Sequence, residues 1–368
     1  MNPTPRTETT DPSSAEAFED AANRLDAHVR EIVRWHFSPE TGTPYWLAWA
    51  DREGRDPRAE VQGFADLDLF GHFDGDLLRD LPHEQWIPRA YAGRPFTIFE
   101  TGGTTGLPKQ RIGWEDYQTD YAAFSETLSD EDFPPGGYWL MIGPTGPRRL
   151  RLAIEYLANH RGSSCYFVDL DPRWVKKLVA AGQGAQAKAY MAHVIDQAAV
   201  ILRKRRVDAL FTTPKLLEAL AERMSIPGAG VKGVFCGGTT MDPQTTRFLV
   251  EEVLEDKVRF VPTYGNTLMG LAVHDPRFVD QGYSITYYAP QPRAVLRVVD
   301  PDDTTRLVDY DAWGRVELTT LTSELFLPRF LERDEGRRRR PAGAWAWDGV
   351  GEVRPFRAEA ETIVEGVY

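Results

Sequence analysis

Cysteine is scarce in this sequence, which has only Cys165 and Cys236 among 368 residues. So few cysteines argue against the disulfide framework of a small secreted protein and fit a reducing compartment. Both lie in apolar, strand-like runs, so we expect their thiols to be buried and unreactive.

Long apolar runs and an excess of positive charge are also missing. No run approaches the roughly 20 apolar residues of a membrane-spanning helix, and the first residues lack the basic start and apolar core of a signal peptide. The chain has 43 Lys and Arg against 55 Asp and Glu, a net charge of −12. We therefore predict a cytoplasmic protein that binds neither membrane nor nucleic acid, and an anionic ligand would need local positive charge.

Glycine and threonine are concentrated in residues 101–109, TGGTTGLPK. Backbone N–H groups in such a loop can surround an anion, hydroxyl groups add donors, and a lysine adds positive charge. The spacing differs from a Walker loop, because Leu107 and Pro108 separate the last glycine from the lysine. Proline disfavours a following helix, so we expect the chain to return as a strand over 110–113. A solvated turn is the alternative. The candidate phosphate-binding residues are Thr101, Gly102, Gly103, Thr104, Thr105, Gly106 and Lys109.

Strand-like and helical patterns alternate from residue 138 to 262, which favours βαβ units and a largely parallel sheet. An amphipathic helix is expected from Ala15, short helices and turns over 37–95, and strands without intervening helices from Ile285. The expected strands cover 138–142, 164–168, 208–212, 231–236 and 258–262, and the helices cover 114–128, 148–159, 188–204, 214–224 and 242–254.

Two further motifs follow predicted strands. Gly237 and Gly238 end one strand and precede Thr239, and Tyr264, Gly265, Asn266 and Thr267 end the next. Ligands of open α/β sheets bind at the carboxyl ends of strands, where a glycine pair lets a flat base lie against the backbone. A plain strand-to-helix turn is the alternative for the glycine pair.

These three motifs, in this order, resemble the adenylate-forming superfamily of acyl-CoA synthetases and peptide-synthetase adenylation domains. The segment from Gly314 to Asp334 looks like the phenylacetate-CoA ligase branch. The resemblance covers about residues 60–355. It implies that Lys109 and the loop threonines bind the β- and γ-phosphates, and that Thr267 contacts the α-phosphate. It also implies that Gly237, Gly238 and Tyr264 frame adenine, and that Asp334 binds the ribose, although a solvated charge is the alternative for Asp334.

The fold implied is α/β: a layered αβαβα adenylate-forming N-terminal domain with a β-rich, distorted-barrel subdomain. We predict a disordered tail over 1–14, the adenylation core over 15–280 and the β-rich subdomain over 281–368. Relatives carry a mobile C-terminal lid domain that supplies a lysine, and the sequence is expected to lack it because it stops at Tyr368, shortly after the expected hinge at 347–351.

The resemblance fails at one position that matters. The family's Tyr-Gly segment ends in a glutamate that binds Mg²⁺, whereas this sequence has Leu268, which cannot bind a hard cation. ATP is the expected cofactor, and Mg²⁺ is in doubt. Glu100 or Glu317 could substitute as the metal ligand, or triphosphate binding is weakened.

The resulting hypothesis is ATP-dependent activation of an aromatic carboxylic acid as its acyl-adenylate. The short form is similar to adenylating enzymes of phenazine (griseoluteic acid type) antibiotic biosynthesis, with a reductase or acyl acceptor protein as partner. The alternative is a catalytically lapsed subunit that binds a nucleotide or an aryl acid. Outside these motifs, we expect an exposed loop over 337–340, a surface position for His274, and packing roles for Trp345 and Trp347.

Overall fold

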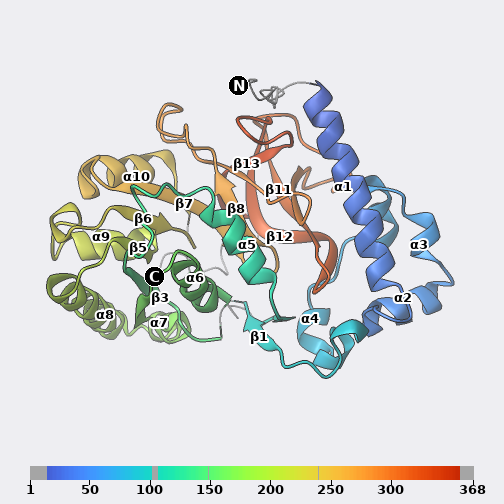
Figure 1. The fold of residues 1–368 in the computed structure, drawn as a ribbon, viewed down its shortest axis with the longest axis horizontal. Coiled ribbons are helices and arrows are strands. Elements are labelled where there is room, and N and C mark those ends of the chain that lie inside the picture. Colours follow the sequence, from blue (N-terminus) through green and yellow to red (C-terminus); the bar gives the residue numbers. More distant parts are fainter. Residues whose placement is uncertain (1–14, 102–106, 148, 239, 357–368) are drawn as a thin grey trace, which may run out of the picture.

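One eleven-stranded sheet runs through the molecule, and a separate hairpin of β1 and β2 lies beside it (Figure 1). The computed structural model describes residues 15–101, 107–147, 149–238 and 240–356. The strand order in the large sheet is β10-β11-β12-β13-β9-β8-β7-β6-β5-β3-β4. The strands are β1 (Thr97–Glu100), β2 (Gln110–Gly113), β3 (Trp139–Gly143), β4 (Cys165–Asp169), β5 (Ala209–Thr212), β6 (Gly233–Cys236), β7 (Arg259–Asn266), β8 (Gly270–His274), β9 (Thr286–Tyr288), β10 (Ala294–Val299), β11 (Trp313–Leu321), β12 (Phe326–Arg339) and β13 (Gly349–Pro355).

Helices cover both faces of the parallel strands. The α-helices of the described residues are α1 (Ala15–His36), α2 (Pro44–Glu53), α3 (Pro57–Glu60), α4 (Leu77–Asp80), α5 (Asp116–Ser125), α6 (Arg149–His160), α7 (Pro172–Ala180), α8 (Gly184–Lys204), α9 (Pro214–Ala221) and α10 (Pro243–Phe248), of which α5 to α9 cover the parallel strands. Short 3₁₀ helices are η1 (Phe64–Phe70), η2 (His83–Gln85), η3 (Arg89–Tyr91) and η4 (Pro227–Ala229), and η5 (Leu249–Val253) continues α10 as a π-helical turn. The expected alternation of strands and helices is confirmed.

Side chains of β3 show why this half forms two layers of core. Trp139 and Met141 enter the core under α5 and α6, whereas Leu140 and Ile142 enter the core on the opposite face. Successive side chains of a strand point to opposite faces, so a continuous apolar run suits a strand buried on both sides. All four of these side chains are fully buried.

Strand β7 joins the parallel half of the sheet to the antiparallel half. Its residues 259–262 pair in parallel with β6, and its residues 263–266 pair antiparallel with β8. From there the sheet is antiparallel through β9, β13, β12, β11 and β10. The expected β-rich character of the later chain is confirmed. The predicted boundary between residues 280 and 281 stays a prediction.

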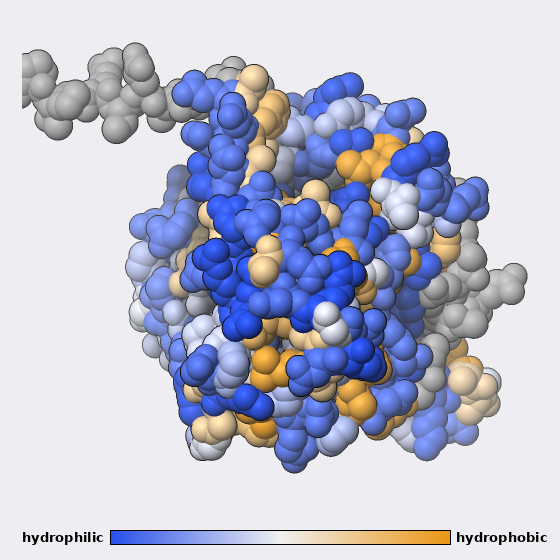
Figure 2. Space-filling model, turned by 90° about the vertical axis from the view of Figure 1, so that its right-hand side faces the viewer, coloured by the Kyte–Doolittle hydropathy of each residue, from blue (hydrophilic) through white to orange (hydrophobic). Residues whose placement is uncertain are grey.

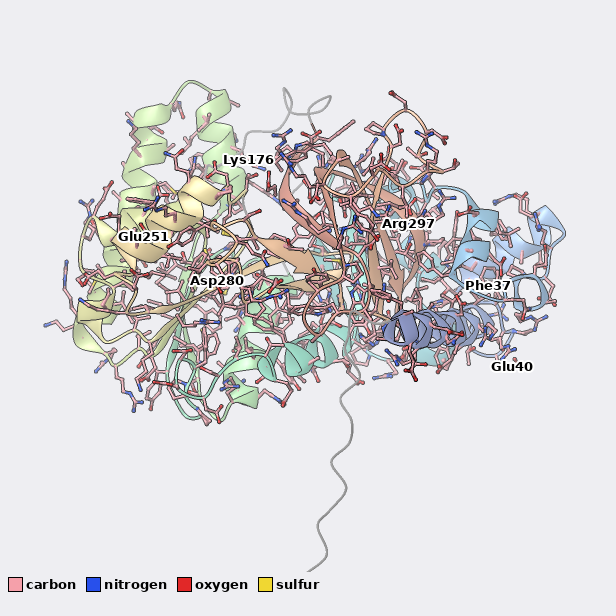
Figure 3. All side chains as sticks on the ribbon, turned by 90° about the horizontal axis from the view of Figure 1, so that it is seen from above. Phe37, Glu40, Lys176, Glu251, Asp280 and Arg297 are labelled. Carbon is pink, nitrogen blue, oxygen red and sulfur yellow. The ribbon has the colours of Figure 1, made fainter. Side chains whose placement is uncertain are left out.

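The N-terminal helices pack against the antiparallel half. The Trp35 indole N–H donates to the Ser323 carbonyl at 3.0 Å, and the Trp46 indole N–H donates to the Phe326 carbonyl at 3.1 Å. Seen from above, Phe37 and Arg297 lie in this part of the molecule, away from Glu251 and Asp280 in the α/β part (Figure 3). The face shown in Figure 2 is mostly hydrophilic, with small separate hydrophobic areas.

The most extensive difference from the sequence-based expectation is the 14-residue strand β12. The expected exposed loop over 337–340 is wrong, because Arg337, Arg338 and Arg339 belong to this strand and are partly buried. Arg338 pairs with Asp348 at 2.7 Å, and Arg339 pairs with Glu352 at 2.9 Å. Residues 337–339 show no alternation of apolar and polar side chains. Their acidic partners on neighbouring segments stabilise them in the sheet instead.

Three smaller expectations concern single side chains. Trp345 stacks on Tyr288 with ring centroids 4.5 Å apart, which confirms a packing role. Cys236 is buried as expected, whereas Cys165 is only partly buried, and burial raises the pKa of the Cys165 thiol to about 12 and also that of Cys236. The surface position expected for His274 is wrong: its ring nitrogens are buried, and burial lowers the pKa of the ring to about 4.

Among the described residues, no helix combines the length and the apolar character that crossing a bilayer requires. The tail expected over 1–14 lies outside the described residues.

Candidate functional site

The glycine loop is closed at its base by a hairpin. Strands β1 and β2 pair antiparallel with Glu100 opposite Gln110, so the expected return as a strand is confirmed. The Thr101 N–H donates to the Lys109 carbonyl at 3.0 Å, and the Lys109 N–H donates to the Thr101 hydroxyl at 3.1 Å. The Thr101 side chain therefore helps to close the hairpin. The predicted residues 102–106 lie outside the described residues.

Lys109 extends from this hairpin toward β12. Its ammonium nitrogen lies 4.6 Å from the centroid of the Phe330 ring and rests against Gly75, where an added Cβ would lie only 2.3 Å away. Burial lowers the pKa of Lys109 from its usual value, and the nearby Glu332 carboxylate opposes that shift. The predicted phosphate-binding cation is thus held beside β12 by an aromatic face.

Two hydrogen bonds connect the end of β7 with the middle of β12. The Tyr264 hydroxyl donates to the Asp334 carboxylate at 2.7 Å, and the Asn266 amide donates to the Glu332 carboxylate at 2.7 Å. These four side chains thus form two hydrogen-bonded pairs, called rungs below, between strands that are not neighbours in the sheet. Tyr264 and Asp334, predicted from separate motifs, therefore lie together.

Electrostatics at the two rungs are governed by burial. Burial and the adjacent Asp334 carboxylate raise the pKa of Glu332 to about 7, although Lys109 opposes the shift. Burial and Asp334 also raise the pKa of Tyr264 well above its usual value. Sequence reasoning missed Glu332 and Phe330. No regular pattern marked them, because the pairing of β12 with β11 shifts register between residues 331 and 335.

The predicted α-phosphate ligand, Thr267, lies in a tight turn after β7. The Asn266 side-chain oxygen accepts hydrogen bonds from the N–H groups of Leu268 at 2.9 Å and Met269 at 2.7 Å. The Thr267 hydroxyl donates to the Glu100 carbonyl at 3.4 Å, so this turn meets the base of the glycine-loop hairpin. Two motifs that are far apart in sequence are therefore adjacent.

A buried arginine supports that turn from behind. Arg111, on β2, donates to the carbonyls of Thr267 at 3.2 Å and Leu268 at 2.7 Å. It also pairs with Asp116 at 2.6 Å, and Arg293 pairs with the same carboxylate at 2.9 Å. Although burial opposes the shift, these two guanidinium groups hold the pKa of Asp116 below its usual value. A buried charge network thus connects β2, α5 and the Thr267 turn.

The glycine pair lies where β6 approaches β7. The Gly237 N–H donates to the Thr212 carbonyl at 3.3 Å. A Cβ on Gly237 would lie 2.8 Å from the Thr263 hydroxyl and 3.1 Å from the Thr263 carbonyl oxygen, so any larger residue would have to displace Thr263. The pair is at the carboxyl end of β6, as expected, while Thr239 lies outside the described residues.

Replacing Gly237 with alanine is therefore expected to lower the free energy of unfolding by about 1–3 kcal/mol. The new methyl group pushes against Thr263, whose hydroxyl donates to the Cys236 carbonyl at 3.2 Å. Urea denaturation measures the change. Gly184→Ala is the control, because a Cβ there meets no atom within 4 Å. Equal denaturation midpoints for the two variants would contradict the close approach.

Two of the positions considered for magnesium, Leu268 and Glu100, do not present an open carboxylate. Leu268 is 3% exposed and packs in the core. Glu100 forms an ion pair with Arg173 and accepts a hydrogen bond from Gln110 at 3.2 Å. Among the described residues, no group of three or more His, Cys, Asp or Glu side chains is placed to bind a metal.

The second substitute considered for the metal, Glu317, is occupied elsewhere. Its carboxylate is fully buried and pairs with Arg329 at 3.1 Å, with His72 at 3.1 Å and with Arg297 at 3.4 Å. This cluster stabilises the contact between β11, β12 and the N-terminal segment. It supplies no ligand to the site around Thr267.

Comparison with solved structures identifies the fold. An open conformation of 2-hydroxyisobutyryl-CoA ligase in complex with 2-HIB-AMP and CoA aligns with a TM-score of 0.63 and 13% identity, over 95% of this chain and 73% of the ligase. The same ligase in its postadenylation state with R3-HIB-AMP gives 0.64 and 12%, over 96% and 72%. The amide bond synthetase McbA from Marinactinospora thermotolerans gives 0.45 and 15%, over 70% and 48%. Searches with protein-family profiles and curated sequences find no match. The chain has the adenylate-forming domain fold.

Proposed function

We propose that this protein activates a carboxylic acid with ATP as an acyl-adenylate. The observation that carries the proposal is the meeting of three motifs around β7: the Thr267 turn touches the base of the glycine loop, and Tyr264 bonds to Asp334. This site follows the carboxyl end of the parallel segment of β7, where ligands of α/β sheets bind. The fold agrees with this activity, since 2-hydroxyisobutyryl-CoA ligase was solved with an acyl-AMP bound.

In the proposed reaction, a carboxylate oxygen of the acid attacks the α-phosphorus of ATP. The bond between the α-phosphorus and the bridging oxygen breaks, pyrophosphate leaves with both bonding electrons, and the mixed anhydride remains. Lys109 and the hydroxyl groups of the loop stabilise the negative charge of the departing pyrophosphate. Thr267 donates to the α-phosphate, and Asp334 accepts from the ribose hydroxyl groups once Tyr264 releases it. Gly237 and Gly238 give adenine access to the backbone. No step is assigned to Mg²⁺, because Leu268 is apolar and the carboxylates of Glu100 and Glu317 are already paired with arginines.

For the substrate we propose an aromatic carboxylic acid, and for the role a step in phenazine-like secondary metabolism. Support comes from the sequence resemblance to the phenylacetate-CoA ligase branch. The sequence also has aromatic residues around Phe235 and Tyr288, which are compatible with an aromatic substrate. In the structure both side chains are fully buried and pack against other rings. An acyl-adenylate is reactive, so a reductase or an acyl acceptor protein is the proposed partner for the next step.

A second function, a subunit that binds nucleotide or aryl acid without catalysis, is favoured by one observation. Leu268 is buried at the position where the resembling family places its magnesium-binding glutamate. The two proposals differ in a measurable reaction, because only the enzyme exchanges labelled pyrophosphate into ATP in the presence of its acid.

Replacing Lys109 with alanine is expected to reduce acid-dependent pyrophosphate exchange roughly tenfold to hundredfold, since a hydrogen bond to a charged group contributes about 1.5–3 kcal/mol. The assay uses a panel of aryl and alkyl acids. Lys232→Ala, which removes an exposed lysine beyond the site, is the matched control and should retain full exchange. Nucleotide binding without exchange for any acid of the panel would favour the second function instead.

A further inference from the structure

A groove lies between α7, α8 and α9, on the side of the sheet opposite to α5 and α6. Its volume is about 480 Å³, within the range of about 300–1,000 Å³ that is typical of small-molecule sites. Its lining is predominantly apolar, and no residue of it belongs to the site around Thr267. The apolar wall consists mainly of Val175, Val179, Ala187, Met191, Ile195 and Ala219.

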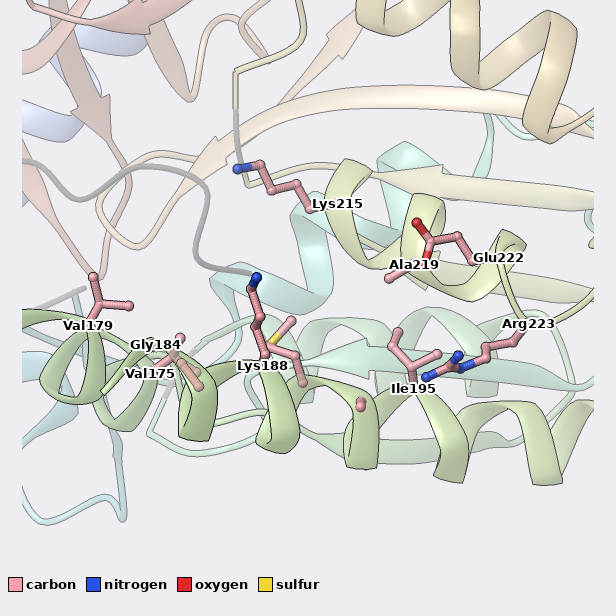
Figure 4. Close-up of a pocket in the computed structure, with 12 residues that line it drawn as sticks. Val175, Val179, Gly184, Lys188, Ile195, Lys215, Ala219, Glu222 and Arg223 are labelled. Atoms are coloured by element: carbon pink, nitrogen blue, oxygen red, sulfur yellow. The ribbon is translucent and has the colours of Figure 1, made fainter. Parts of the chain in front are cut away.

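Two lysines stand at this groove without acidic partners. Lys188, near the start of α8, and Lys215, near the start of α9, point toward the same open side (Figure 4). Neither ammonium group forms an ion pair with any acidic side chain in the part of the chain that the structure describes. Arg223, farther along the groove, is already paired with Asp196 at 3.4 Å. Glu222 also lines the groove, at the end near Arg223, so the excess of positive charge lies at the end where Lys188 and Lys215 stand (Figure 4).

Charge and shape together select a class of ligand. An apolar wall favours a hydrocarbon or aromatic body, which gains free energy roughly in proportion to the apolar area that leaves water. Two ammonium groups on one side of the groove favour an anionic head, because opposite charges attract more strongly where water is partly excluded. A second, weaker contribution comes from the positive N-terminal ends of α8 and α9.

We propose that this groove binds an amphiphilic monocarboxylate, with its hydrocarbon body against the apolar wall and its carboxylate between Lys188 and Lys215. This binding site is separate from the adenylation site and does not depend on the proposed function. It involves no chemical change of the ligand.

Isothermal titration of the full chain with sodium decanoate, without nucleotide, tests the proposal. Saturable binding is expected, and decyltrimethylammonium, which has the same chain length and the opposite charge, should bind at least tenfold more weakly. The double variant Lys188→Gln/Lys215→Gln should bind decanoate roughly tenfold or more weakly, because it loses charge-assisted contacts to the carboxylate. The matched control Lys204→Gln/Lys232→Gln removes the same charge from exposed positions outside the groove and should bind like the unchanged protein.

Two further variants locate the binding. Ala219→Phe, which fills the groove, should abolish decanoate binding while circular dichroism remains unchanged, and Lys109→Ala should leave it intact. The proposal is overturned if the binding of decanoate does not saturate. That result would be expected if the groove bound only another protein. The proposal is also overturned if the cationic amphiphile binds equally well or the groove double variant keeps full affinity.

Discussion

Arg111→Met is expected to lower the free energy of unfolding by about 3 kcal/mol or more. The substitution removes one of the two guanidinium groups that compensate the buried Asp116 carboxylate, and breaking one side of a buried ion pair typically costs about 3–5 kcal/mol. It also leaves the carbonyls of Thr267 and Leu268 without this donor. Urea unfolding followed by circular dichroism measures the loss.

A matched surface pair separates burial from charge. Arg94 pairs with Glu115 at 2.8 Å, and both side chains are well exposed, so Arg94→Met should cost less than about 1 kcal/mol. If the two variants unfold at the same urea concentration, the buried ion pairs of Arg111 contribute no more to stability than the exposed pair of Arg94. The proposed binding of ATP gives a second readout, since Arg111→Met should weaken nucleotide affinity through the Thr267 turn and Arg94→Met should not.

Glu332 should make the folded protein less stable as the pH rises from about 4.5 to 7. Burial and Asp334 raise the pKa of Glu332 from 4.5 to about 7, so the folded state keeps a proton that the unfolded state has released. Unfolding then releases a proton in this window, and raising the pH favours unfolding. At about 1.4 kcal/mol per pKa unit, the loss reaches at most about 3 kcal/mol.

The variant Glu332→Gln isolates this effect. The amide cannot ionise, so the difference in unfolding free energy between the variant and the unchanged protein should grow in favour of the variant between pH 4.5 and 7. Glu131→Gln, at an exposed position, should follow the unchanged protein throughout. If the free energy of unfolding depends on pH in the same way for Glu332→Gln and the unchanged protein, Glu332 does not hold a proton in the folded state. The charged groups that face Glu332 are Lys109, Arg333 and Asp334.

Much of the α/β half could be predicted from local signals. Pro214 begins α9 after Thr213, as expected from the preference of proline for the first helical turn, although the Thr213 hydroxyl makes no capping bond. Asp242 caps α10 by accepting from the Thr245 N–H at 2.7 Å. Helix α7 was missed even though Asp171 and Pro172 carry the same start signal, because its apolar positions span only nine residues.

The candidate site was less accessible to sequence reasoning. The glycine loop, Tyr264 and Thr267 could be named because glycine, aromatic and hydroxyl residues follow strand-like runs, and Asp334 could be named from the family resemblance. Arg111 and Glu332 could not, because an isolated charged residue in a polar segment is normally solvated, and their partners at Thr267 and Asn266 are distant in sequence. Tertiary partners that lie 60 or more residues away leave no local pattern.

Strand β7 has a consequence for any attempt to dissect the protein. Its first residues are hydrogen-bonded to β6 and its last residues to β8, so this one strand belongs to both the parallel and the antiparallel half of the sheet. Cutting the chain at β7 would leave an exposed edge strand on each fragment. The unpaired backbone groups of such an edge promote aggregation. Neither half is therefore expected to fold alone. Chimeric proteins made from this chain and a relative should keep β7 intact and be joined outside it.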